Sequence, residues 1–186
     1  MPTLRTERLV LRPFAPADAA RVRELAGERD VASTTLTIPH PYEEGMAESW
    51  IAGHAAAWDE RNRLSLAVTH GVDGVIGAIG LNVAPQHAHA ETGYWIGAPY
   101  WNRGFATEAL GAILAHGFGE LGLHRVLARH FPRNPASGQV LRKAGMVHEG
   151  IMREHVRRWD RFEDLECYAI LERDWRSRPA VRSVDQ

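Results

Sequence analysis

One ten-residue run, residues 101–110, constrains the fold of this chain more than any other. It reads Trp-Asn-Arg-Gly-Phe-Ala-Thr-Glu-Ala-Leu. A glycine turn at Gly104 leads directly into an amphipathic helix, and the strand-like residues 91–97 precede it. A strand, a small-residue turn and a helix N-terminus direct several backbone N–H groups to one point, where the helix dipole also favours negative charge. The run therefore predicts a phosphate-binding loop between a strand and a helix.

The length of 186 residues predicts a single domain, residues 1–176, followed by a polar tail at residues 177–186. The net charge of −1 provides no overall field that would attract nucleic acid or acidic lipid, so we expect neither as a partner. No segment approaches the ~18 apolar residues of a membrane span, and the charged N-terminus lacks an apolar leader. These features predict a cytoplasmic protein. They leave its oligomeric state open, with a homodimer as one possibility.

The hydrophobic periodicity predicts an α/β (α+β) fold with about seven strands. Strands are expected at residues 8–12, 64–69, 75–81, 91–97, 125–130, 146–156 and 162–171, and helices at residues 16–27, 43–60, 105–121 and 134–144. Residues 31–41 are expected to form an irregular loop. This order predicts a mixed, mostly antiparallel sheet with helices on both faces. The crossover through the Gly104 helix makes its two flanking strands parallel.

Two common phosphate loops do not fit the run at Gly104. A P-loop requires Gly-Lys-Ser/Thr, and the only lysine, Lys143, lies far from the turn. A Gly-x-Gly-x-x-Gly match occurs at residues 117–122, but it ends a helix and precedes a strand. The dinucleotide-binding motif has the opposite context, so we interpret this match as a helix terminator.

The loop and its surroundings resemble the GCN5-related N-acetyltransferases (the GNAT superfamily), and within them the RimJ/RimL type that acetylates ribosomal-protein N-termini. The resemblance rests on seven segments in the same order, at residues 6–13, 76–77, 91–96, 103–109, 134–137, 140–146 and 149–153. Three positions depart from the wider family. Trp101 stands where glutamine or arginine is usual, and Leu141 stands where many relatives carry a tyrosine general acid. Met146 replaces an expected aromatic residue with one that still packs.

This resemblance implies a GNAT fold in which the two parallel central strands splay apart in a V and admit the pantetheine arm of acetyl-CoA. Backbone groups of the strand would bond to that arm and to the thioester oxygen, the loop amides would hold the pyrophosphate, and Asn134 would bond to the pantetheine. The residues expected to contact acetyl-CoA are Trp95, Ile96, Gly97, Asn102, Arg103, Gly104, Phe105, Ala106, Thr107, Asn134, Ser137 and Lys143.

Acetyl transfer also requires a group that accepts the ammonium proton and, where the thiolate needs help, a proton donor. We expect Glu91 to be the base, because it starts the strand that leads into the cleft. The alternative is a solvated glutamate at a strand end. Ser137 is the expected acid, and the alternative is a serine that caps free N–H groups at a helix N-terminus. A thiolate leaves readily, so the reaction need not require a dedicated acid.

The remaining polar clusters carry weaker expectations. His87 and His89 lie in a loop without acidic or cysteine partners at ligand spacing, so we expect no metal. His130 is the histidine nearest to the expected cleft, although a surface imidazole is favoured there. Arginines around Trp159 predict a basic hairpin with a solvated tip. The alternative, functional interpretation is that this hairpin contacts an acidic acceptor or ribosomal RNA.

The acceptor would be set by residues 31–41 and by the hairpin, neither of which carries a chemistry-specific motif. The first hypothesis is a protein or peptide N-terminal α-amine. The second is a small amine such as a polyamine, an amino acid or an aminoglycoside. The third is a CoA-binding sensor or interaction module without turnover.

Overall fold

The computed structural model describes residues 1–59 and 63–178. Its strands are β1 (Leu4–Arg5), β2 (Leu9–Arg12), β3 (Arg63–His70), β4 (Gly74–Ala84), β5 (His89–Ile96), β6 (Arg125–His130), β7 (Val147–Arg158) and β8 (Arg161–Leu171). Its helices are α1 (Ala19–Ala26), α2 (Arg29–Ser33), α3 (Met46–Ala52), α4 (His54–Asp59), α5 (Phe105–Gly119), α6 (Pro135–Lys143) and α7 (Glu172–Arg176).

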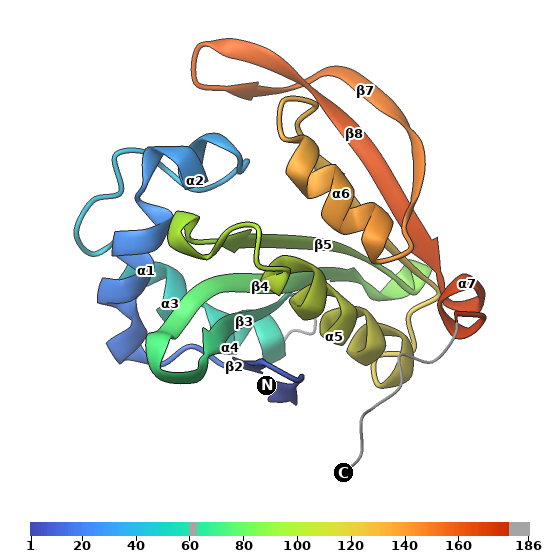
Figure 1. Ribbon diagram of the computed structural model, residues 1–186, viewed down its shortest axis with the longest axis horizontal. Helices are drawn as coiled ribbons and strands as arrows, with labels where there is room; N and C mark the ends of the chain where they lie inside the picture. The colour runs from blue at the N-terminus through green and yellow to red at the C-terminus, as the bar shows by residue number, and fades with distance from the viewer. Residues whose placement is uncertain (60–62, 179–186) are drawn as a thin grey trace.

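The described strands form one eight-stranded sheet in the order β1-β2-β3-β4-β5-β6-β8-β7 (Figure 1). Every neighbouring pair is antiparallel except β5 and β6, which are parallel and are joined through α5. The predicted mixed sheet and its single parallel pair are therefore confirmed. The additional strand is β1, whose two residues are too few to produce a recognisable alternation.

Two predicted segments differ from the structure. The helix expected at residues 43–60 is two short helices, α3 and α4, which meet at Gly53, and residue 60 lies outside the described residues. The loop expected at residues 31–41 begins inside α2, where Val31 and Ala32 are buried. A five-residue helix is too short for hydrophobic periodicity to separate it from a loop. Residues 179–186 of the predicted tail also lie outside the described residues.

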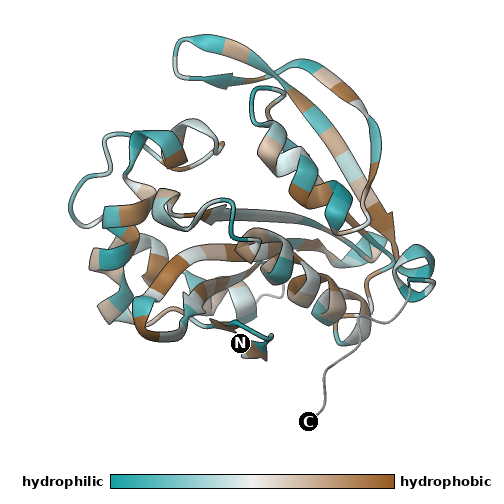
Figure 2. Cartoon of the chain, in the orientation of Figure 1, coloured by the Kyte–Doolittle hydropathy of each residue, from teal (hydrophilic) through white to brown (hydrophobic). Residues whose placement is uncertain are grey.

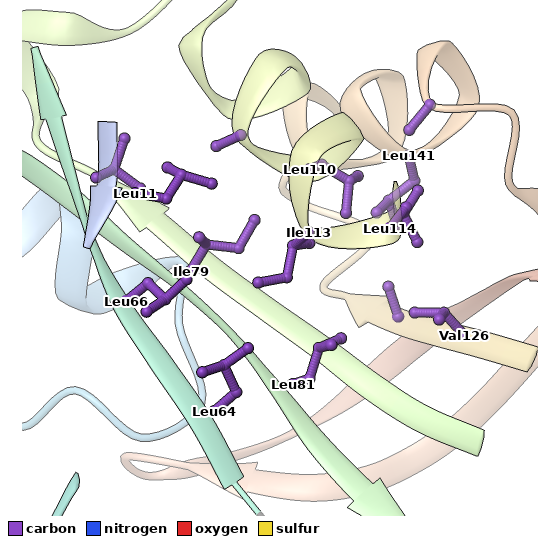
Figure 3. Close-up of a cluster of buried hydrophobic side chains, with 14 of the residues drawn as sticks. Leu11, Leu64, Leu66, Ile79, Leu81, Leu110, Ile113, Leu114, Val126 and Leu141 are labelled. Atoms are coloured by element: carbon purple, nitrogen blue, oxygen red, sulfur yellow. The ribbon is translucent and has the colours of Figure 1, made fainter. Parts of the chain in front are cut away.

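The sheet separates two layers of helices, and each layer has its own core. On the first side, which we call the α5 face, Leu110, Ile113 and Leu114 of α5 pack against Leu66 and Leu81 of the central strands (Figure 3). On the opposite side, the α1 face, side chains of α1 and α3 pack against Ala67 and Val75. Because both faces of β3 and β4 are covered, these strands read as nearly continuous apolar runs.

The β7–β8 hairpin is the longest pair of strands, and its far end projects beyond the layers of the sheet (Figure 1). Hydrophilic and hydrophobic bands follow one another along it (Figure 2). At its tip Arg158 donates from Nη2 to the carbonyl oxygens of Ala32 at 2.9 Å and Ile38 at 2.5 Å. Arg158 is therefore docked on α2 and on the segment that follows it, and the prediction of a solvated tip is wrong for this residue.

Candidate active site

A cavity opens where β5 and β6 separate. Within the described residues their register consists of three pairs and ends at Glu91 and Leu127, although both strands continue. Beyond this point Tyr94 and Trp95 of β5 and Arg129 of β6 line a cavity of about 1260 Å³. The expected V-shaped splay of the two parallel strands is confirmed.

The loop before α5 has the backbone of an anion site. Asn102 and Gly104 have φ values of 60° and 80°, and they flank Arg103, which does not share this conformation. Alternating handedness of this kind turns successive N–H groups toward one side. No side chain caps α5, and its first helical hydrogen bond runs from Glu108 N to Gly104 O at 3.1 Å. The first-turn amides therefore suit an anion, and Ala106 and Thr107 line the cavity.

Trp101, the atypical residue of the loop, bonds to the end of β5. Its indole Nε1 donates to the carbonyl oxygen of Ile96 at 2.6 Å. The residue therefore gives up the side-chain phosphate contact that glutamine or arginine would make. In exchange it fixes the loop to the strand that leads into the cavity.

The backbone of β5 alternates between its neighbour β4 and the splay. Gly97 N donates to Ile76 O of β4 at 2.9 Å, so the peptide groups of Trp95 and Gly97 face β4. Those of Ile96 and Tyr94 then face the splay. This alternation favours Ile96 and Tyr94 over Trp95 and Gly97 as backbone partners for a molecule held between the strands.

Ser137 and Asn134 enter the cavity from the first turn of α6 on the α5 face. The side-chain oxygen of Asn134 accepts from Ser137 N at 3.3 Å, so Asn134 is the residue that caps the helix. Its amide group stays available to donate. The Ser137 hydroxyl is not used as a cap and lies 2.9 Å from the phenol oxygen of Tyr94.

Glu91 projects from β5 on the α1 face and forms an ion pair with Arg129 of β6. Arg129 Nε donates to one carboxylate oxygen at 2.8 Å and Nη2 donates to the other at 2.6 Å. The hydrogen bond with Glu91 raises the pKa of Arg129, so the guanidinium remains charged. Each carboxylate oxygen keeps a further lone pair for an amine or a water.

Residues 6–8, which belong to the first of the seven segments that resemble the GNAT superfamily, form hydrogen bonds that hold the loop before α5. Glu108 Oε1 accepts from the Thr6 hydroxyl at 2.6 Å and from Arg8 N at 2.9 Å, and Oε2 accepts from Arg8 Nε at 2.7 Å. Arg8 Nη1 also donates to Arg103 O at 3.0 Å. Burial alone would raise the pKa of Glu108, but these hydrogen bonds lower it below its usual value. The N-terminal segment therefore fixes the start of α5.

The histidines do not form a site of their own. No three His, Cys, Asp or Glu side chains in the described ranges are grouped so that they could hold a metal ion. His130 is buried on the α5 face, where Nδ1 lies 2.8 Å from Phe131 O and the ring packs against Tyr168. The favoured surface position is therefore wrong, because the alternation of β6 turns this residue inward beneath α6.

Sequence reasoning missed three residues of the site: Tyr94 and Arg129, which line the cavity, and Glu108, which holds the start of α5. All of them lie within or beside segments singled out above. Their roles depend on partners 38 to 102 positions away, so their local patterns carried no signal.

None of the helices in the described part of the chain is long and apolar enough to span a membrane.

Comparison with known proteins decides the family. Residues 8–147 match the family described as acetyltransferase (GNAT) domain. The chain belongs to the GNAT acetyltransferase family. It is 30% identical over 178 residues to the uncharacterized N-acetyltransferase p20 of Bacillus licheniformis, covering 94% of this chain and 99% of that protein.

Two further relatives are more specific in their names. The chain is 31% identical over 98 residues to the ribosomal-protein-serine acetyltransferase of Escherichia coli, covering 52% of this chain and 55% of that protein. It also matches the structure of Mycobacterium smegmatis RimJ in complex with CoA-disulfide, with a TM-score of 0.80 and 25% identity, covering 91% of this chain and 86% of that one.

Membership in this GNAT family fixes the reaction class. The protein is an N-acetyltransferase, and acetyl-CoA is its acetyl donor. The cavity fits this donor chemically, since the anion loop and Ser137 both line it. Lys143, in the last turn of α6, also lines the cavity and is exposed, so it suits a phosphate group.

Proposed function

We propose that this GNAT enzyme transfers the acetyl group to the α-amine of a protein or peptide N-terminus, by direct attack of the amine on the thioester. The proposal rests on two sets of polar groups that lie on opposite faces of the sheet at the splay. Asn134 and Ser137 lie on the α5 face, and Glu91 lies on the α1 face. The donor and the acceptor thus meet at β5 from opposite faces of the sheet.

In this arrangement the protein residues assigned to acetyl-CoA first bind and orient it. The amides at the start of α5 hold the pyrophosphate, and the Asn134 amide and the peptide group of Tyr94 orient the pantetheine arm. The Ile96 N–H then donates to the thioester oxygen as negative charge develops there. A single backbone donor of this kind contributes about 3 kcal/mol to transition-state stabilisation.

Glu91 acts as the base that removes a proton from the acceptor amine. A primary amine is protonated at neutral pH and must lose a proton before it can attack a carbonyl carbon. Glu91 accepts that proton directly or through one water, while Arg129 holds both carboxylate oxygens in place. A positioned base of this kind contributes about 10²–10⁴-fold to the rate.

The charge of the cavity favours an α-amine over a polyamine. Among the residues that line it, the carboxylates are Glu44 and Glu91, and the arginines are Arg63 and Arg129. A polyamine carries several positive charges, and its recognition requires an excess of carboxylates. A peptide N-terminus presents one ammonium group, for which Glu91 suffices. The name of the Escherichia coli relative, which covers about half of the chain, agrees with a protein acceptor.

The experiment that tests the proposal measures thiol release from acetyl-CoA with N-terminal peptides, polyamines, amino acids and aminoglycosides in parallel. Turnover with peptides and little with the other amines is the expected result. Turnover with a small amine alone would replace the proposed acceptor. Tight CoA binding without turnover on any amine would favour the CoA-binding module, which is the remaining alternative.

A further inference from the structure

Two hydroxyl groups meet inside the splay, one from a strand and one from a helix. The phenol oxygen of Tyr94 lies 2.9 Å from Ser137 Oγ and 3.4 Å from the Ser137 carbonyl oxygen. Both residues line the cavity. Burial raises the pKa of the Tyr94 phenol to about 12, although its hydrogen bond with Ser137 opposes part of this rise. The phenol therefore keeps its proton near neutral pH.

The acidities of the two groups favour one direction for their hydrogen bond, in which Tyr94 donates. A phenol is a much stronger acid than an aliphatic hydroxyl, so Tyr94 is the better donor and Ser137 Oγ the better acceptor. A serine in a helix otherwise turns its hydroxyl back toward a carbonyl of the preceding turn. With Tyr94 as donor, the Ser137 hydroxyl hydrogen stays free to point into the cavity.

We propose that Tyr94 is a positioning residue, which holds the Ser137 hydroxyl so that it donates a hydrogen bond to the sulfur of coenzyme A. This inference rests on the proposed function, because it uses the placement of the thioester in the splay. It assigns a role to a residue of β5 whose peptide group and side chain both reach the splay.

The reaction step that the pair serves is the departure of coenzyme A. The amine nitrogen forms a bond to the carbonyl carbon, and the carbon–sulfur bond then breaks with its electron pair left on sulfur. Ser137 donates a hydrogen bond to this thiolate and keeps its own proton. The thiolate takes up the proton that the amine released, through water. Neither hydroxyl is consumed.

The chain offers a matched control in Tyr168. Its phenol oxygen accepts from Arg142 Nη1 at 2.7 Å, so both tyrosines bond to α6, one at its first turn and one at its last. Tyr168 packs on the α5 face but is not among the residues that line the cavity. Tyr168→Phe therefore removes a comparable hydrogen bond from the same helix without touching the site.

The first test requires no acceptor amine. Ultraviolet absorbance of the thiolate of bound coenzyme A is recorded against pH for the wild type, Tyr94→Phe, Ser137→Ala and Tyr168→Phe. A hydrogen bond to a charged form lowers its pKa, so the bound thiol should titrate lowest in the wild type and in Tyr168→Phe. Tyr94→Phe and Ser137→Ala should both raise its pKa. An unchanged titration in Tyr94→Phe overturns the inference and leaves the proposed acetyl transfer intact.

The second test measures turnover with the acceptor that the amine panel identifies. Loss of one positioned hydrogen bond should lower kcat roughly tenfold in Tyr94→Phe, with KM for acetyl-CoA changed less than about twofold. The double variant with Ser137→Ala should be no slower than Ser137→Ala alone, because Tyr94 acts through Ser137. Ser137→Thr, which keeps a hydroxyl, should recover most of kcat. Equal losses in Tyr94→Phe and Tyr168→Phe, or independent effects in the double variant, would overturn the inference.

Discussion

The two faces of β5 are built differently. On the α5 face, a fifteen-residue helix and the capped helix α6 cover the sheet, and several hydrogen bonds tie the loop before α5 to the N-terminal segment. On the α1 face, the short helices α2 and α3 and the irregular residues between them line the cavity. The hairpin tip closes over this side through Arg158.

This difference matches the places proposed for the two substrates. Acetyl-CoA always presents the same pyrophosphate and pantetheine, so its side benefits from a backbone held in one geometry. The acceptor differs from one enzyme of the family to another, and short helices and loops tolerate such variation. A single strand joins the sides, because alternate residues of β5 point to opposite faces. In this way Tyr94 points to the α5 face and Glu91 points to the α1 face.

The largest effect is expected on the α5 face, from Gly104→Val. Gly104 has a φ of 80°, and a Cβ there would lie 3.3 Å from Arg8 Nη2. A β-branched residue strains this conformation by about 1–3 kcal/mol and crowds the anion site. Calorimetry should show CoA affinity reduced at least roughly 100-fold. The control is Gly111→Val, since Gly111 lies within α5 and has open space around a Cβ. Normal CoA binding by Gly104→Val would show that the loop assignment is wrong.

The next effect tests the α1 face, through Glu91→Gln. Loss of the base should lower kcat about 100-fold at neutral pH, and the affinity for acetyl-CoA should change little. Arg129→Met is the comparison, because it removes the partner of Glu91 and keeps the carboxylate. A base predicts a far larger loss in Glu91→Gln than in Arg129→Met. Equal losses would assign the ion pair a structural role, and unchanged turnover would remove Glu91 from the mechanism.

The sequence allowed the backbone geometry of the loop before α5 to be predicted because this geometry is local. Gly104 and Asn102 are residue types that adopt positive φ, and the helix follows at once. The order of strands and helices was also readable, since β3, β4, β5 and β6 carry strong hydrophobic patterns. The α1 face was predicted less well, because its helices have only five to eight residues and tertiary packing decides where they begin and end.

The side-chain pairs of the site could not be predicted from the sequence. Tyr94 and Ser137 are 43 positions apart, and Glu91 and Arg129 are 38 apart. Each pair exists because β5 and β6 start in register and then separate, a property of the sheet rather than of either segment. The alternation of β5 was visible in the sequence. The groups that each face would meet were not.

A smaller effect on the α5 face is expected from Glu108→Gln. The substitution weakens the hydrogen bonds from Thr6 and Arg8 that fix the start of α5. We expect the dissociation constant of coenzyme A to rise roughly tenfold, with kcat at saturating acetyl-CoA within about twofold of the wild type. Binding calorimetry and saturation kinetics measure the two quantities.

The control for this variant is Asp18→Asn. Asp18 accepts from Arg12 Nη1 at 2.7 Å and Nη2 at 2.8 Å, an ion pair of similar geometry that also anchors the N-terminal region. Both variants should lower the free energy of unfolding, but only Glu108→Gln should weaken CoA binding. If the two variants weaken it equally, Glu108 supports the fold as a whole and not the loop in particular.

The smallest effect is expected on the α1 face, from Arg158→Met. The substitution keeps the length of the side chain but removes the bonds to the carbonyl oxygens of Ala32 and Ile38, so the hairpin loses its fixed position over the acceptor side. The KM for the acceptor should change roughly threefold to fivefold, about 1 kcal/mol, while CoA affinity stays constant. Arg157→Met is the matched control, since Arg157 is the exposed neighbour on the same strand. An equal change in both variants would mean that charge near the hairpin, and not its docking, tunes the acceptor side. A change in CoA affinity would mean that the two faces of β5 are not independent.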